Sequence, residues 1–241
     1  MEQPGAVNPT QGPLLTRLEV LVNLAVDRGG LALDRQGRLV AADAQLVADA
    51  LALGDAPQPT PRELAAIELL RGLAEAVGLL RDRDERLEAT TLRFPWRQLD
   101  PDLRAGLVYA AWCTRIPWTH LLGDTAAPVV QGLSDARTGV LRLLFELRDQ
   151  AEVDLADFTA ALVDRLGLPD GEPLVRAVAA VFLDPLVALG VAEIDQPSPS
   201  LPQSMRLESR ARDIIGAALV ATGQKPPPAP PGRSPHSRPD H

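Results

Sequence analysis

The side chains that could support nucleophilic catalysis lie near the middle of the chain. Cys113 is the only cysteine, and His120 is the only histidine outside residues 223–241. A thiol beside an imidazole can act as nucleophile and base, with a carboxylate such as Asp124 to orient the imidazole. This pair lies in an apolar stretch, however, where a cysteine usually packs as a small hydrophobic residue. The sequence therefore favours a structural role for Cys113, and we predict no catalytic residue.

Metal and cofactor chemistry has equally little support in the sequence. A zinc site needs several histidine or cysteine ligands at short spacing, and the chain has three histidines and one cysteine in 241 residues. The sequence also lacks a glycine-rich loop of the kind that binds phosphate. We therefore predict a non-enzymatic protein with no metal site and no cofactor.

Arginines are the side chains that could contact DNA, and five of them form the candidate set: Arg62, Arg71, Arg81, Arg83 and Arg86. Phosphates and base edges are bound by basic and polar side chains that face outward together. Here acidic residues alternate with the arginines, at Glu63, Glu68, Glu75, Asp82, Asp84 and Glu85. The formal net charge of −8 also repels nucleic acid. The sequence predicts weak DNA binding, and DNA contact through the five arginines is the alternative.

Aromatic residues gather between the two halves of the chain. Aromatic residues make up only 3% of the sequence, yet every tryptophan and the single tyrosine lie here. Tryptophan, tyrosine and arginine anchor interfaces because they combine apolar area with a polar contact. The candidate interface residues are Trp96, Arg104, Tyr109, Trp112 and Trp118. The competing interpretation is that these aromatic side chains form the core that joins the two halves.

Helical patterns in the first half would position the arginines. Apolar spacing predicts helices over 14–26, from Asp43 as N-cap to about 53, and over 61–77. The third has a capping signature in Thr60-Pro61-Arg62-Glu63 and a glycine stop at Gly78. A small hairpin is expected over 31–40, and two short strands over 79–81 and 86–90.

The second half repeats this order. Helices are expected over 139–150, 154–166 and 173–189, the last kinked or split at Pro185. Strands at 191–194 and 205–208 flank a turn at 196–202, and a helix over 209–221 follows. Between the halves, Asp100-Pro101 begins a helix that carries Tyr109 and Trp112.

The two halves share a short sequence pattern as well. Ala76-Val77-Gly78-Leu79-Leu80 leads to Arg86-Leu87-Glu88, and Ala188-Leu189-Gly190-Val191-Ala192 leads to Arg206-Leu207-Glu208. Three helices followed by two short strands resemble the winged-helix superfamily, here in two tandem copies. The resemblance implies a mainly α fold with a two-stranded wing in each copy and an aromatic-rich helical connector. The first copy departs from the simplest pattern in the extra segment 29–42.

The domain organisation follows from this resemblance. We expect a disordered segment 1–13, a first winged-helix-like unit 14–95, a connector 96–136, a second unit 137–222 and a disordered proline-rich tail 223–241. No signal peptide and no apolar run of membrane-spanning length is apparent, so we expect a cytoplasmic protein without a membrane partner.

The functional expectation also rests on the resemblance. Paired acidic winged-helix proteins resemble the subunits that dock on bacterial chromosome-organising complexes. This implies an interaction or adaptor protein that binds a protein partner or forms a homodimer. In DNA-binding members, the third helix enters the major groove and the wing touches the backbone. A winged-helix transcriptional regulator with weak DNA contacts is therefore the alternative.

Overall fold

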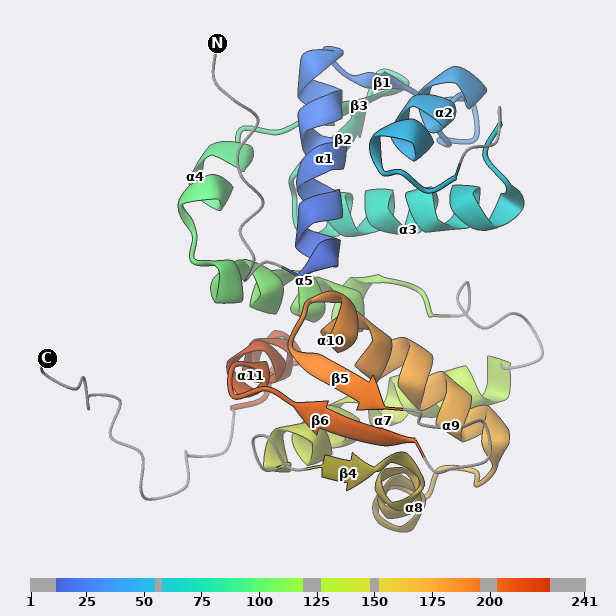
Figure 1. Cartoon of the computed structure of the whole chain (residues 1–241), viewed down its shortest axis with the longest axis vertical. Coiled ribbons are helices and arrows are strands. Elements are labelled where there is room, and N and C mark those ends of the chain that lie inside the picture. Colours follow the sequence, from blue (N-terminus) through green and yellow to red (C-terminus); the bar gives the residue numbers. More distant parts are fainter. Residues whose placement is uncertain (1–11, 55–57, 119–126, 148–151, 196–202, 226–241) are drawn as a thin grey trace, which may run out of the picture.

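The chain is mainly helical, with two small antiparallel sheets of three strands each (Figure 1). The computed structural model describes residues 12–54, 58–118, 127–147, 152–195 and 203–225. Most of the predicted disordered termini, the turn 196–202 and His120 lie outside the described residues. None of the helices in the described ranges has the length and apolar character needed to cross a membrane.

The first half contains helices and strands in the order helix, strand, helix, helix, strand, strand. Their bounds are α1 (Pro13–Asp27), β1 (Leu31–Ala32), α2 (Ala41–Ala50), α3 (Pro61–Ala76), β2 (Leu80–Arg83) and β3 (Arg86–Ala89). In the sheet, β3 lies between β1 and β2, with Leu87 paired to Leu31 on one side and to Asp82 on the other. The expected hairpin at 31–40 is reduced to a single bridge between Leu33 and Leu39, because β1 pairs with β3.

The second half has the same order and the same strand arrangement. Its elements are α7 (Ala127–Glu146), β4 (Glu152–Asp154), α8 (Leu155–Leu166), α9 (Glu172–Val178), the π-helical segment η2 (Ala179–Leu183), α10 (Asp184–Ala188), β5 (Ala192–Asp195) and β6 (Ser204–Leu207). Here β6 is the central strand of the sheet. Strand β4 has no signal in the sequence. The helix expected over 139–150 begins about three turns earlier, at Ala127, because Gly132 and Gly139 interrupt the apolar pattern from which its start was predicted.

Several local sequence signals act as expected. The side chain of Thr60 accepts from the amide of Glu63, whose carboxylate accepts from the amide of Thr60. Asp154 accepts from the amides of Ala156 and Asp157 at the start of α8. The predicted cap at Asp43 was wrong. Val40 is the N-cap of α2, and Asp43 instead accepts from the amide of Ala32 at 2.6 Å, which fixes β1 to α2.

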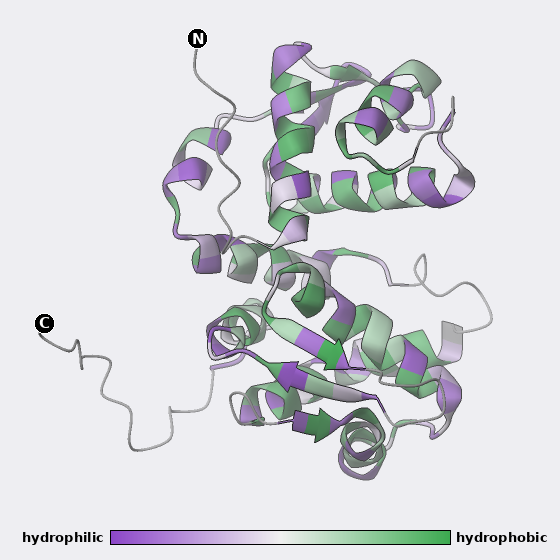
Figure 2. Cartoon of the chain, viewed as in Figure 1, coloured by the Kyte–Doolittle hydropathy of each residue, from purple (hydrophilic) through white to green (hydrophobic). Residues whose placement is uncertain are grey.

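The two halves are joined by α4 (Arg93–Gln98) and α5 (Pro101–Arg115), and the C-terminal helix α11 (Ala211–Ala221) packs along α5. In Figure 1, α5 lies between the two halves, with α3 above it and α10 and α11 below it. Figure 2 shows hydrophobic and hydrophilic residues alternating around α1 and α3, as expected for helices with one apolar face. The buried core is continuous through both halves and α5.

A candidate protein-interaction groove

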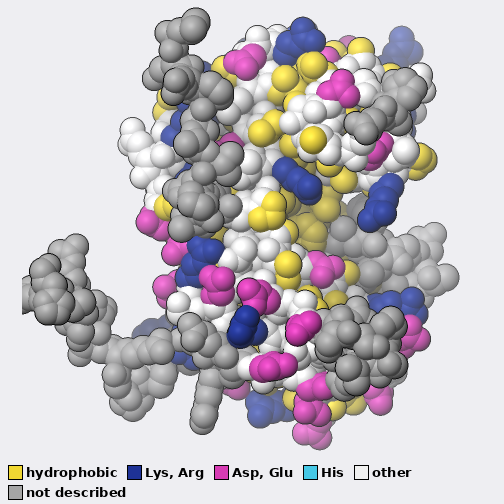
Figure 3. Space-filling view, in the orientation of Figure 1, with side chains coloured by type: hydrophobic (Ala, Val, Ile, Leu, Met, Phe, Trp, Pro, Cys, Tyr) yellow, Lys and Arg dark blue, Asp and Glu magenta, His cyan; other side chains and the backbone are white. Residues whose placement is uncertain are grey.

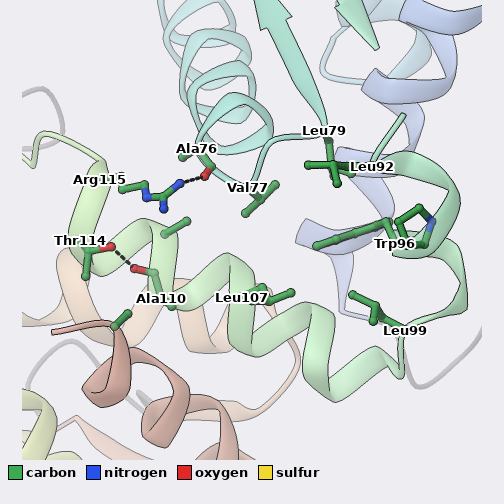
Figure 4. Close-up of a pocket in the computed structure, with 13 residues that line it drawn as sticks. Ala76, Val77, Leu79, Leu92, Trp96, Leu99, Leu107, Ala110, Thr114 and Arg115 are labelled. Carbon is green, nitrogen blue, oxygen red and sulfur yellow. Dashed lines mark hydrogen bonds between the residues drawn. The ribbon is translucent and has the colours of Figure 1, made fainter. Parts of the chain in front are cut away.

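An apolar groove lies between the end of α3, α4, α5 and the end of α11 (Figure 4). Its volume is about 330 Å³, and its walls include side chains from α4, α5 and α11, from the end of α3, and from Leu79 just before β2. The lining residues labelled in Figure 4 are Ala76, Val77, Leu79, Leu92, Trp96, Leu99, Leu107, Ala110, Thr114 and Arg115. Arg115 is the single charged residue among them.

The turn before α4 positions Trp96 in the wall of this groove. The hydroxyl of Thr90 donates to the carbonyl of Gly78 at 2.6 Å and accepts from the amide of Leu92 at 3.2 Å. Arg97 donates to the Asn23 side chain at 2.5 Å, which holds α4 against α1. Trp96 is therefore buried and held in place, and the residues that line the groove with it are apolar except for Thr114 and Arg115.

One face of α5 lines the groove while another packs against α11. Asp100 caps α5 by accepting from the amide of Asp102 at 2.8 Å. A Cβ added at Gly106 would lie 3.1 Å from the Cβ of Ala217, so the glycine permits close packing of the two helices. At the other end, Arg115 donates to the carbonyl of Ala76, which ties α5 to the last turn of α3.

The groove is continued by leucines and a valine that are open to solvent. Leu92, Leu103, Leu107 and Val220 are 53%, 50%, 42% and 58% exposed, respectively. Leu103 and Leu107 are one turn apart on α5, and Val220 adjoins the groove residue Ala221. Exposed apolar side chains beside an apolar groove commonly mark interaction sites. We call the groove and these four residues the connector surface.

The other predicted interface residues lie inside the molecule. Tyr109 is fully buried, and its hydroxyl donates to the carbonyl of Phe182 at 3.1 Å. The indole N–H of Trp112 donates to the carbonyl of Val181 at 2.7 Å. Both acceptors belong to η2, where Pro185 lacks the N–H that would bond the carbonyl one turn earlier. These two aromatic side chains therefore join α5 to the second half.

Trp118 and Arg104 also make contacts within the chain. The indole N–H of Trp118 donates to the carbonyl of Trp112 at 3.2 Å, and its ring packs edge-on against Phe182. Arg104 is buried and forms an ion pair with Glu19, which connects α5 to α1. Of the five predicted interface residues, only Trp96 lines the connector surface. The leucines that open it to solvent were missed, since exposed leucines cannot be told from core leucines by sequence.

The candidate DNA contacts are scattered, and most have partners. The guanidinium Nε of Arg71 lies 2.9 Å from a carboxylate oxygen of Glu68, and the same guanidinium donates to the carbonyl of Gly37. Its hydrogen-bonding groups are therefore used within the fold. Arg86 donates to the carbonyl of Gly30. Arg81 and Arg83 are exposed on the β2–β3 hairpin but pair with Glu88 and Asp84, respectively. Arg62 is exposed near the start of α3, away from that hairpin.

Cys113 has the chemistry of a buried structural residue. Burial raises the pKa of its thiol to about 12, so the thiol is protonated at neutral pH and is not nucleophilic. Burial also raises the pKa of Tyr109 well above its ordinary value. In the part of the chain that the structure describes, no three histidine, cysteine, aspartate or glutamate side chains are grouped as metal ligands.

Comparison with protein-family models, with curated proteins and with solved structures finds no match to this chain.

Proposed function

We propose that this protein is a non-enzymatic interaction or adaptor protein, built from two winged-helix units that share one connector. The observation that carries the proposal is the connector surface, where Leu92, Leu103, Leu107 and Val220 remain exposed around an apolar groove. Fully burying an exposed leucine contributes roughly 1.5–3 kcal/mol, so covering these four half-exposed side chains would contribute part of that amount each to association.

The winged-helix assignment is supported by the order of elements in each half. A helix, a strand, two helical segments and two strands follow one another twice, and the last strand is central in both sheets. The resemblance to acidic winged-helix subunits extends the proposal to a role in chromosome organisation. Fold alone does not specify a partner, and the connector surface is therefore the feature to test.

The partner that we propose for the connector surface is a second copy of the chain. In a two-fold dimer the same patch meets itself, so its centre must be free of like charges. Leu92, Leu103, Leu107 and Val220 are apolar, and the exposed Arg115 lies at one end of the groove, where its guanidinium donates to the carbonyl of Ala76. Such a patch can pack on itself through its apolar centre while Arg115 stays at the margin in contact with water.

Light scattering over a concentration series tests this proposal. We expect the native chain to form dimers at micromolar concentrations. The double variant Leu103→Glu with Leu107→Glu should be monomeric, because both substitutions place a carboxylate in the interface. Both side chains are exposed, so circular dichroism should show unchanged helix content. A matched control is Leu64→Glu, an exposed leucine of α3 outside the groove. A native chain that stays monomeric at high concentration contradicts the proposal.

The alternative is a DNA-binding regulator, and the exposed Arg62, Arg81 and Arg83 are the observation in its favour. A fluorescence titration with duplex DNA at physiological salt separates the two functions. We expect weak or absent binding, since paired arginines and a net charge of −8 leave few net phosphate contacts. Submicromolar, sequence-selective affinity that is lost in Arg81→Ala with Arg83→Ala would favour the regulator.

A further inference from the structure

A second apolar groove lies between α1, α2 and α3, on the side of the molecule shown in Figure 3. It consists of two adjoining hollows of about 120 and 440 Å³, which share Arg17 and Leu51. Its apolar walls include Leu14, Leu53, Leu69 and Leu73, and Trp112 contributes to the smaller hollow. Figure 3 shows hydrophobic side chains gathered over these three helices, with charged side chains at their margins.

Two exposed arginines, Arg17 and Arg62, flank this groove. Arg17 lines both hollows and is exposed, and Arg62 lies one turn before the lining residue Ala66 on α3. Within the described residues, neither side chain has a hydrogen bond or an ion pair. Nearby arginines differ, since Arg71 pairs with Glu68 and Arg104 pairs with Glu19.

We propose that this groove binds an acidic amphipathic helix of a protein partner. The apolar stripe of such a helix would cover the leucines, and its flanking carboxylates would pair with Arg17 and Arg62. This mode matches helix-in-groove recognition, in which residues at i, i+3, i+4 and i+7 enter a hydrophobic groove. The charge assignment follows from the two arginines, because a basic helix would place like charges opposite them.

The groove also has the length that a short helix needs. Arg62, Ala66 and Leu69 form one accessible stripe along α3, and the buried Leu73 forms the floor at its far end. At 1.5 Å per residue the span from Arg62 to Leu73 is about 16 Å, which corresponds to roughly three turns of a partner helix. A nucleic acid would use the arginines but leave the leucines uncovered, so a peptide fits the groove better.

This inference rests on the proposed function as an interaction protein but uses a different surface. The probe is a synthetic helical peptide of about 16 residues, with leucines on one face and glutamates on both flanks. The comparison peptide has lysines in place of the glutamates and the same leucines. Fluorescence anisotropy of each labelled peptide is measured with the full-length protein. We expect the glutamate peptide to bind at least about tenfold more tightly, as each charge pair that is lost or reversed weakens binding.

The double variant Arg17→Glu with Arg62→Glu should reverse this preference and favour the lysine peptide. Arg28→Glu with Arg35→Glu is the matched control, because both arginines are exposed and, within the described residues, have no ion pair at their side chains. The control changes the net charge equally and should keep the native preference. Circular dichroism checks that both variants remain folded.

Three outcomes would overturn the inference. The native chain could bind the two peptides equally, it could bind neither peptide, or the control variant could show the same reversal of preference. Loss of self-association in Arg17→Glu with Arg62→Glu would assign the groove to a second copy, which also overturns it. Leu103→Glu with Leu107→Glu should bind the glutamate peptide as the native chain does. If that variant disrupts dimers while the peptide fails to bind, the inference fails and the proposed function stands.

Discussion

At the scale of single residues, the tryptophans divide by what their indole N–H groups contact. Trp112 donates to the carbonyl of Val181, whereas the buried indole nitrogen of Trp96 has no hydrogen-bond partner among the described residues. Trp112 is thus a polar link as well as a packing residue. Trp96 contributes apolar area, both to the core and to the groove.

This difference predicts unequal effects of the same substitution. Trp112→Phe should cost about 1–3 kcal/mol more stability than Trp96→Phe, because it leaves the buried carbonyl of Val181 unpaired. Trp112→Ala should cost roughly 3–5 kcal/mol, as for other buried aromatic residues. Denaturant unfolding of the three variants measures these differences. Equal losses for the two phenylalanine variants would show that the hydrogen bond contributes no net stability.

The thiol of Cys113 predicts a pH dependence. Its pKa is raised to about 12 in the folded chain, while an unfolded thiol ionises near 8.5. Above that pH the unfolded state loses a proton that the folded state keeps, so stability falls as the pH rises from about 8.5 toward 12. Cys113→Ala should be less sensitive between pH 8.5 and 10 when unfolding free energies are compared. The same decline in both proteins would contradict this assignment.

At the scale of elements, the segment from α9 to α10 shows how α5 stabilises an irregular helix. Pro185 cannot donate to the carbonyl of Val181, and η2 widens the helix at this point. Trp112 donates to the carbonyl of Val181 instead, and Tyr109 donates to the neighbouring carbonyl of Phe182. The helix and α5 therefore depend on each other for backbone hydrogen bonding.

A double-mutant cycle tests this dependence. In Pro185→Ala, residue 185 regains an N–H that can donate to the Val181 carbonyl. Trp112→Phe should then cost less in the Pro185→Ala background than in the native chain, with a coupling of about 0.5–3 kcal/mol. Thermal or denaturant unfolding of the four proteins supplies the cycle. Additive effects would mean that the two residues act independently.

At the scale of the whole molecule, the two halves pack closely on each other through more than α5. The backbone of Gly12 lies against the end of α10, and a Cβ there would come within 2.2 Å of the Leu189 carbonyl carbon. Arg210 in addition links the second half to α5, since it lies 3.3 Å from Asp102 and also donates to the carbonyl of Gly190. Contacts of this kind favour one cooperative unfolding unit.

Gly12→Ala should therefore lower stability by about 1–3 kcal/mol, since backbone atoms must move apart to admit the methyl group. Gly132→Ala is the control, because its Cβ would meet only the Leu168 side chain at 3.4 Å within a helix. That change should be neutral or stabilising. Differential scanning calorimetry compares both variants with the native chain. An unchanged melting temperature in Gly12→Ala would contradict the close packing.

The sequence by itself determined the local elements with strong start and stop signals. Thr60, Gly78 and Asp154 mark helix ends, and their contacts are with residues only a few positions away. The local sequence is therefore enough to predict where these helices begin or end. The same holds for β2 and β3, whose turn residues Asp84 and Glu85 both adopt positive φ. The repeat of helices and strands followed from such signals.

Tertiary structure alone decided the rest. β4 is three residues long and exists because β6 supplies its partners, so no local pattern marks it. The aromatic residues of α5 were recognisable as a set, but their burial depends on η2 and α11, which lie far along the chain. The exposure of Leu103 and Leu107 likewise depends on which faces of α5 its neighbours cover. Burial is a property of packed surfaces, and composition and spacing do not specify it.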